Sequence, residues 1–126
     1  MQLDERSVQR LEGVHADLVR VSMRAAELTE VAFIVTEGLR TMKRQRELVA
    51  AGASKTLKSR HLTGHAIDFA PVVGGEVTWK WPAFPIIADA FKRAAKELGV
   101  AIVWGGDWTS FRDGPHIELD RKVYAS

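Results

Sequence analysis

A hairpin signal in the middle of the chain restricts the fold more than any other feature. Residues 65–73 (HAIDFAPVV) have the composition of a strand, a glycine pair follows at 74–75, and residues 76–81 (EVTWKW) alternate as a partner strand. Two strand-like segments separated by a two-residue glycine turn are typical of antiparallel neighbours. The sequence therefore predicts an antiparallel sheet, and helices elsewhere in the chain must pack against it.

Helical periodicity surrounds this hairpin. Apolar residues recur at intervals of three and four from Val8 to Leu28, which predicts one amphipathic helix with Asp4 or Ser7 as its cap. The other expected elements are a central strand at 31–38, helices at 41–52 and from Pro82 and Pro85 to Gly99, and strands at 100–104 and 115–119. This order indicates an α+β fold, with helices on one face of a small, mainly antiparallel sheet. At this length we expect a single domain, residues 1–126.

The short helix at 41–52 has recognisable ends. Thr41 is a suitable N-cap, and Gly52 follows the last helical residue. Met42 and Leu48 are expected to face inward, which leaves the basic run at 43–46 (KRQR) on a solvated face.

Composition limits the chemistry that is available. The chain has no cysteine, so a metal ion would have to be held by the four histidines and by carboxylates. The 18 basic residues are offset by 16 acidic ones, which argues against nucleic-acid binding. Residues 1–30 carry frequent charges and no long apolar run, so they predict neither a signal peptide nor a transmembrane segment.

Strand alternation predicts a polar face on the sheet. In the strand at 65–73, Asp68 points away from the side that carries Ile67 and Phe69. In the last strand, the same alternation places His116 and Glu118 opposite the core-facing residues. Two strands thus present carboxylates and an imidazole on what we expect to be one open face.

His61 lies in the loop that enters this strand, where Gly64 permits a tight turn back towards Asp68. His61, Asp68 and His116 would then form a set of three ligands, the usual number for a catalytic zinc. The residues alone equally allow the three side chains to be ordinary loop and strand residues that bind no metal, because no single spacing among them is diagnostic of a metal site. His15 is interpreted as structural, and His65, which points away from Asp68, as a packing residue.

Two segments resemble the motifs of a known family. SRHLTGHAID (59–68) fits Ser-x-His-x-x-Gly-x-Ala-x-Asp, and DGPHIE (113–118) fits acid-x-x-His-x-Glu. Together they resemble the zinc D,D-peptidases and L-alanyl-D-glutamate peptidases, which include many phage endolysins. GLRTMKRQRELVAAGASKT (38–56) and WGGDW (104–108) are similar to further segments of that family. The resemblance implies the small α+β fold that these peptidases share with the hedgehog signalling domain.

The resemblance also implies roles for individual residues. His61, Asp68 and His116 would bind one catalytic Zn²⁺, and Asp113 would be the general base. Arg40 and Gln45 correspond to positions near the substrate, with Arg40 either stabilising the oxyanion or gripping a substrate carboxylate. An alternative for Arg40 is a surface ion pair with Glu37 or Glu47.

Three further residues are candidates for supporting roles. Ser59 begins the first motif, Glu118 could orient a ligand histidine or be solvated, and Trp108 is the tryptophan best placed to line a substrate groove.

The expected function is that of an endolysin, which hydrolyses the L-Ala–D-Glu bond of bacterial peptidoglycan stem peptides. The alternatives are a D-Ala-D-Ala carboxypeptidase or dipeptidase with the same zinc site, and a non-catalytic zinc-binding domain of the same fold. As an endolysin, the protein is expected to be a monomer that stays in the host cytoplasm until it is released to the cell wall.

Overall fold

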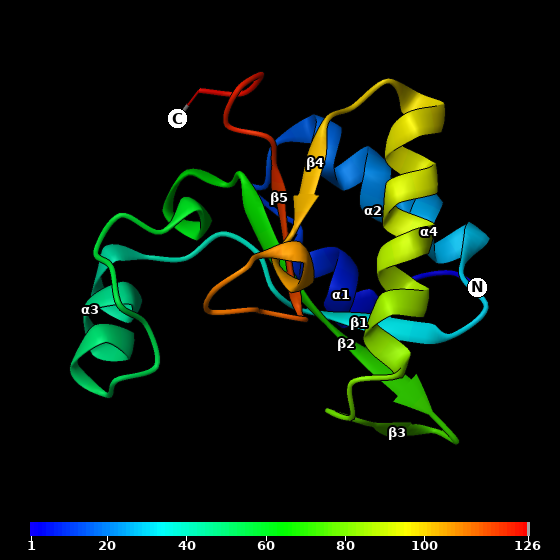
Figure 1. Ribbon diagram of the computed structural model, residues 1–126, viewed down its shortest axis with the longest axis horizontal. Helices are drawn as coiled ribbons and strands as arrows, with labels where there is room; N and C mark the ends of the chain where they lie inside the picture. Colours follow the sequence, from blue (N-terminus) through cyan, green and yellow to red (C-terminus); the bar gives the residue numbers. More distant parts are fainter. Residues whose placement is uncertain (126) are drawn as a thin grey trace.

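The computed structural model describes residues 1–125 (Figure 1). Its helices are α1 (Glu5–Arg10), α2 (Ala16–Leu28), α3 (Met42–Ala50) and α4 (Ala83–Leu98), with short 3₁₀ turns η1 (Arg60–Thr63) and η2 (Gly105–Asp107). Its strands are β1 (Ala32–Glu37), β2 (Ala66–Val73), β3 (Glu76–Val77), β4 (Ile102–Trp104) and β5 (His116–Leu119). The structure confirms the α+β class predicted from the sequence.

All strand pairs are antiparallel. Four strands follow the order β1-β2-β5-β4, and β3 pairs with the end of β2. The prediction of a central strand at 31–38 was wrong, because β1 lies at the edge of the sheet. Helix α1 lies against β1, and the Ser7 hydroxyl accepts a hydrogen bond from the Val35 N–H at 2.9 Å. An edge strand covered in this way buries Phe33 and Val35, so its composition is that of an interior strand.

The predicted hairpin is present but short. Its second strand covers only Glu76–Val77 rather than 76–81. Beyond it the chain turns towards α4, and the Trp81 ring stacks on Trp104 with 5.6 Å between ring centroids. The alternation of residues 76–81 therefore reflects two exposed tryptophans near the start of α4, and not a long strand.

The helix predicted from Val8 to Leu28 is interrupted. Helix α1 ends at Arg10, Gly13 adopts a φ of 81°, and the His15 imidazole caps α2 by accepting a hydrogen bond from the Asp17 N–H. The predicted Asp4 cap is confirmed, whereas Val8 is exposed. The break is tertiary in origin, since the His15 N–H donates to the Gly64 carbonyl in the loop that leads into β2.

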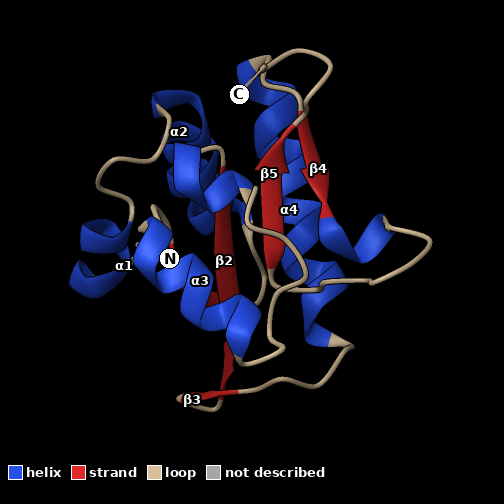
Figure 2. Ribbon diagram, turned by 90° about the vertical axis from the view of Figure 1, so that its left-hand side faces the viewer, coloured by secondary structure: helices blue, strands red, loops and turns tan. Residues whose placement is uncertain are grey.

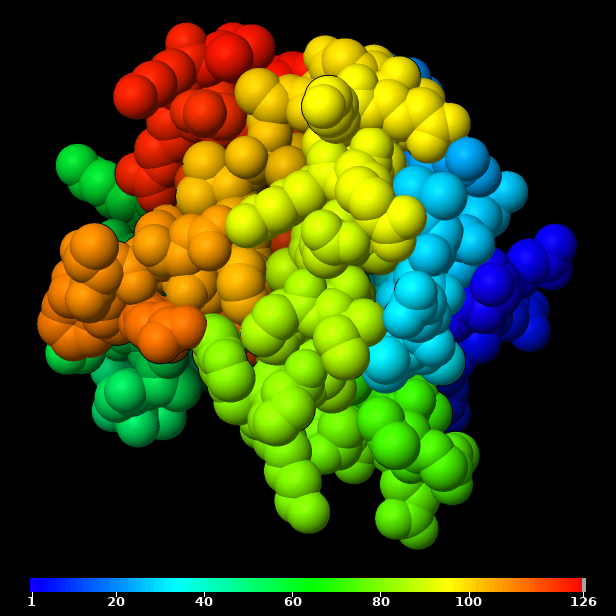
Figure 3. Space-filling model, turned by 45° about the vertical axis from the view of Figure 1, so that its right-hand side comes forward, coloured from blue at the N-terminus to red at the C-terminus, as the bar shows by residue number. Residues whose placement is uncertain are grey.

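The core lies on one side of the sheet. Helices α2 and α4 pack together over that face, where Phe33, Phe69 and Phe91 form a cluster with ring centroids 5.2–5.9 Å apart. Figure 3 shows α4, in yellow-green to yellow, covering this side of the molecule. Among residues 1–125, no helix combines the length and apolarity that a membrane span requires.

Helix α3 departs from the expected arrangement, because it lies on the opposite side of the sheet from α4 (Figures 1 and 2). Its ends agree with the prediction, since Thr41 caps it and Gly52 follows with a φ of 77°. Met42, however, is exposed, and the residue that α3 buries is Gln45. The inward side of α3 is therefore polar, and it faces the polar face of the sheet.

Candidate metal centre

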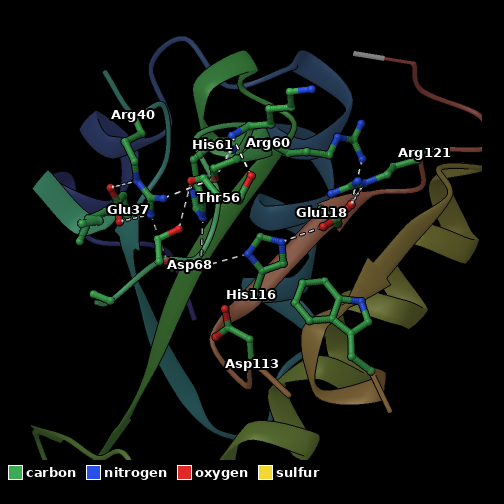
Figure 4. A pocket seen from close by; sticks show the side chains of 16 residues that line it. Glu37, Arg40, Thr56, Arg60, His61, Asp68, Asp113, His116, Glu118 and Arg121 are labelled. Atoms are coloured by element: carbon green, nitrogen blue, oxygen red, sulfur yellow. Dashed lines mark hydrogen bonds and ion pairs between the residues drawn. The ribbon is translucent and has the colours of Figure 1, made fainter. Parts of the chain in front are cut away.

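Three side chains from different elements converge on the polar face. His61 comes from η1, Asp68 from β2 and His116 from β5, and their ligand atoms all lie within 4.8 Å of one another. The Asp68 Oδ1 atom is 3.3 Å from His61 Nε2 and 3.4 Å from His116 Nδ1. Figure 4 shows both imidazoles next to the Asp68 carboxylate. The three predicted ligands are thus brought together.

Local backbone structure explains this convergence. Asp68 and His116 are direct partners in the β2–β5 ladder, so strand pairing alone makes them neighbours. His61 reaches them because Gly64, with a φ of 76°, ends η1 and turns the chain back into β2. A Cβ at Gly64 would also lie 2.5 Å from the Gly13 carbonyl oxygen, so a larger residue would push the loop away.

Each imidazole is oriented by an acceptor on its far side. His61 Nδ1 lies 2.9 Å from the Gly38 carbonyl oxygen, and His116 Nε2 lies 2.9 Å from Glu118 Oε1. These oxygens require a proton on the nitrogens that face them. His61 Nε2 and His116 Nδ1 are therefore the nitrogens directed at Asp68, as ligation of a shared ion requires.

Asp68 shows that the donor set fits a cation. Among the described residues, its Oδ1 atom is a buried side-chain oxygen without a hydrogen-bond partner. A buried carboxylate oxygen without a partner is costly, and a cation is the natural partner for it. Two imidazole nitrogens and one carboxylate oxygen are a donor set typical of catalytic zinc.

The charges of the site are strongly coupled. Burial raises the pKa of Asp68, but contacts with His116 and His61 outweigh burial and hold that pKa well below its ordinary value. Burial lowers the pKa of His116, but contacts with Asp68 and Glu118 raise it to about 9. Burial likewise opposes ionisation of Glu118, yet His116 and Arg60 lower its pKa to about 2. The free site is thus a network of paired charges.

Asp113 lies beside these ligands (Figure 4). Its backbone carbonyl accepts a hydrogen bond from the His116 N–H at 3.2 Å, and its own N–H donates to the Gly105 carbonyl at 3.0 Å. Burial and the negative charge of Asp68 raise the pKa of the Asp113 carboxyl. A carboxylate with a raised pKa at the edge of the site is suited to accept and return a proton.

Arg40 is committed to neighbours within the protein. Its Nε and Nη2 atoms pair with both carboxylate oxygens of Glu37 at 2.6 and 2.7 Å, and its Nη1 donates to Gln45 Oε1 at 2.7 Å. Its Nη2 is 3.9 Å from Asp68 Oδ2, on the opposite side of the carboxylate from the histidines. The alternative considered for Arg40, an ion pair with a glutamate, is present with Glu37, although the Arg40 side chain is buried and not on the surface. Its position next to Asp68 is that of a support for this carboxylate.

Gln45 and Ser59 complete this support. Gln45 is fully buried, and its amide nitrogen donates to Ser54 Oγ and to the Thr56 carbonyl, which ties α3 to the loop before η1. Ser59 caps η1 by accepting from the His61 N–H, and it receives a further bond from Arg40 Nη1 at 3.4 Å. Both residues therefore contact the ligand-bearing loop, and Gln45 has no surface open to a substrate.

A pocket of about 430 Å³ opens over the three ligands. Its wall includes Arg40, Trp108, Asp113 and Glu118 together with the loop at 53–59. The Trp108 ring lies 5.1 Å from the His116 ring, between centroids, whereas Trp104 is buried and donates from Nε1 to the Gly114 carbonyl. The placement of Trp108 agrees with the expectation that it lines a groove.

Two residues of the site were not identified from the sequence as functional candidates. Glu37, considered only as a surface partner, lies opposite Asp68 because the β1–β2 ladder is irregular between Val35 and Glu37. Arg60 occupies a variable position of the first motif, yet it is buried and paired with Glu118 at 3.0 Å. Charge alone does not distinguish a buried arginine from an exposed one, so the sequence carried no signal for Arg60.

Known proteins are similar to this chain in sequence and in fold. The family model of phage L-alanyl-D-glutamate peptidases matches residues 1–125. The L-alanyl-D-glutamate peptidase of Escherichia phage T5 is 38% identical over 122 residues, which cover 94% of this chain and 88% of the relative. The crystal structure of the Serratia marcescens L-Ala D-Glu endopeptidase ChiX superposes with a TM-score of 0.94 at 48% identity, covering 100% of this chain and 95% of that one.

A more distant structure shares the fold alone. The vancomycin-resistance D,D-dipeptidase VanXYg superposes with a TM-score of 0.52 at 16% identity, over 84% of this chain and 50% of that one. The match over nearly the whole length and the identity to the phage T5 enzyme show that this chain belongs to the phage L-alanyl-D-glutamate peptidase family.

Proposed function

We propose that the protein is a zinc-dependent endopeptidase that hydrolyses the L-Ala–D-Glu bond of peptidoglycan stem peptides, as its family is named for doing. The observation that carries this proposal is the convergence of His61, Asp68 and His116 on one point below an open pocket. Membership of the family is the reason for proposing the L-Ala–D-Glu bond as the one cleaved, and the set of two imidazoles and one carboxylate is the reason for proposing zinc.

His61 Nε2, Asp68 Oδ1 and His116 Nδ1 would hold the ion. When bound, zinc would supply Lewis acidity for the peptide carbonyl and would lower the pKa of the attacking water towards neutral. The protein contributes preorganisation, because the Gly38 carbonyl, Glu118 and Arg40 keep the three ligands directed at one point before any ion arrives.

Asp113 is the proposed general base. It takes a proton from the water that adds to the L-Ala carbonyl carbon, and it returns a proton to the amine of D-Glu as the C–N bond breaks. Its raised pKa favours both steps, since a carboxylate whose pKa lies closer to neutral binds and releases protons more evenly. Trp108 forms part of the pocket wall beside the reacting groups.

Digestion of purified sacculi followed by mass spectrometry tests the bond. We expect fragments that begin with D-Glu together with glycan strands that end their stem at L-Ala. Release of free D-Ala as the sole product would instead establish a D,D-carboxypeptidase built on the same site. Metal analysis of the purified protein, with chelation and zinc rescue of the same digestion, tests the cofactor separately.

The biological setting follows from the same proposal. A lytic enzyme of this kind would act as a monomer, held in the host cytoplasm until another protein opens the inner membrane. Light scattering of the purified protein tests the oligomeric state. Fractionation of expressing cells tests the location, and lysis that needs no membrane-opening partner would contradict this part.

A further inference from the structure

Arg60 is a buried arginine inside the first motif. Its side chain is 3% exposed, and its guanidinium lies between the loop at 59–64 and the last strand. Nη1 donates to Glu118 Oε2 at 3.0 Å and to the Leu119 carbonyl, and Nη2 donates to the Tyr124 carbonyl at 2.8 Å. One side chain therefore joins η1, β5 and the C-terminal turn.

Glu118 links Arg60 to the proposed metal ligand. Its Oε2 atom accepts from Arg60, and its Oε1 atom lies 2.9 Å from His116 Nε2. His116 Nδ1, on the other side of the ring, faces Asp68. The contacts thus run without a gap from the Tyr124 carbonyl through Arg60 and Glu118 to the imidazole. Figure 4 shows Arg60, Glu118 and His116 in this arrangement.

The physical role of the arginine follows from burial. Glu118 is 4% exposed, and a buried carboxylate is stable only where its charge is compensated and its oxygens are bonded. Arg60 compensates that charge and fixes the position of Oε2 with a charge-assisted hydrogen bond. The remaining oxygen, Oε1, is then held where it meets the His116 ring.

We propose that Arg60 is a positioning residue of the metal centre, which sets the orientation of His116 through Glu118. The inference rests on the proposed zinc site and adds to it a residue that never contacts the ion. It also makes the Tyr124 turn part of the support of the site, since Arg60 is anchored to that backbone.

A second arginine supplies a matched control. Arg121 Nε donates to the same Glu118 Oε2 atom at 3.2 Å, but the Arg121 side chain is 70% exposed. An exposed pair contributes little because water screens it and the side chain keeps its freedom. The two arginines therefore differ in burial while sharing one acceptor oxygen.

The test measures zinc affinity by competition with a chromophoric chelator at fixed pH, which requires no peptidase activity. We expect Arg60→Met to weaken zinc binding by about 10-fold, at the lower end of the range for residues that support a metal ligand. Arg121→Met should change the affinity by less than about 2-fold, as an exposed pair predicts. Equal affinities of Arg60→Met and the wild type would overturn the inference.

A double variant separates positioning from general stability. Glu118→Gln should weaken zinc binding by about 10- to 100-fold, and adding Arg60→Met to it should cause little further loss if Arg60 acts through Glu118. Fully multiplicative losses would contradict the proposal. Arg60→Lys should recover part of the affinity, because it restores the charge beside Glu118 without the planar fork.

Two further measurements cover the case in which Arg60→Met folds poorly. Asp4→Ala removes the cap of α1, which does not contact the site, so it should lower the thermal midpoint without changing zinc affinity. The visible spectrum of bound Co²⁺ should change in Arg60→Lys and not in Asp4→Ala. A wild-type protein that binds no zinc would refute the proposed metal centre itself, which is a different outcome from equal affinities.

Discussion

The two faces of the β2–β5 strand pair differ in chemical character, since one is apolar and packs in the core and the other is polar and carries the candidate metal centre. On one face, Ile67, Phe69 and Ile117 are fully buried against the helices. On the other face, Asp68 and His116, each adjacent in sequence to one of these residues, form the candidate metal centre with His61, and Glu118 contacts His116. Residues one position apart therefore experience an apolar core and a charged cluster.

The difference between the faces lies in how each is held together. The core face is stabilised by burial, which has no preferred direction and tolerates small changes of shape. The polar face depends on individual hydrogen bonds and charge pairs, each aimed at a particular atom. A substitution on the core face should thus reduce stability, whereas one on the polar face should remove function and leave the fold.

The largest expected effect comes from removing a ligand. In His116→Ala, zinc should no longer bind at one ion per chain and hydrolysis of sacculi should fall to background, since two ligands do not retain the ion. The metal-free variant should still fold, as circular dichroism would show. A variant that keeps one zinc per chain would show that His116 is not a zinc ligand and that the polar face does not have the proposed function.

A second prediction concerns chemistry without metal binding. Asp113→Asn should lower kcat/KM by about 10²- to 10⁴-fold, the usual contribution of a general base. Its zinc content should equal that of the wild type, because Asp113 is outside the ligand set. An Asp113→Ala protein that degrades cell walls at the wild-type rate would show that Asp113 is not the general base.

The matching change on the core face is Phe69→Ala, next to the ligand Asp68. Loss of a ring packed against Phe33, Phe84 and Phe91 should cost about 3–5 kcal/mol of unfolding free energy. Urea denaturation of the metal-free protein measures this cost. At a temperature where the variant is folded, its zinc stoichiometry should be unchanged, and a loss of zinc would show that the two faces are coupled.

The smallest effect is expected at the start of α1, away from both faces. Asp4→Ala removes the cap of that helix and should cost about 1 kcal/mol. The hydrogen bonds with Ser7 lower the pKa of Asp4 in the folded protein. The contribution of Asp4 to the free energy of unfolding is therefore fully present above the ordinary carboxyl pKa, and it is lost as the pH falls through the lowered pKa of the folded state.

The stability difference between wild type and Asp4→Ala should accordingly shrink below about pH 4. Denaturation at several pH values measures this change. Zinc affinity near neutral pH serves as the control and should be the same in both proteins.

Short-range patterns were sufficient for much of the molecule. Strand alternation predicted which side of β2 carries Asp68, and the turn allowed by Gly64 predicted that His61 would reach it. The caps Asp4 and Thr41 and the end of α4 at Gly99 were also correct. Each of these features depends on neighbours within a few residues, which is the range that a sequence displays directly.

Features that depend on distant contacts were not accessible in this way. The break before α2 depends on the hydrogen bond from the His15 N–H to the Gly64 carbonyl. Strand β1 has the composition of an interior strand although it lies at the edge, because α1 covers it. The support given by Arg40 and Arg60 depends on which acceptors surround each guanidinium, and these come from other elements.

The sequence by itself determined the kinds of element, the ligand types and the family motifs, because these are written in local spacing and residue chemistry. Only the tertiary structure decided which charges are buried. Burial sets the strength of a charge pair, and it is a property of everything packed around the pair. For this reason His61, Asp68 and His116 could be named in advance, whereas the arginine behind Glu118 could not.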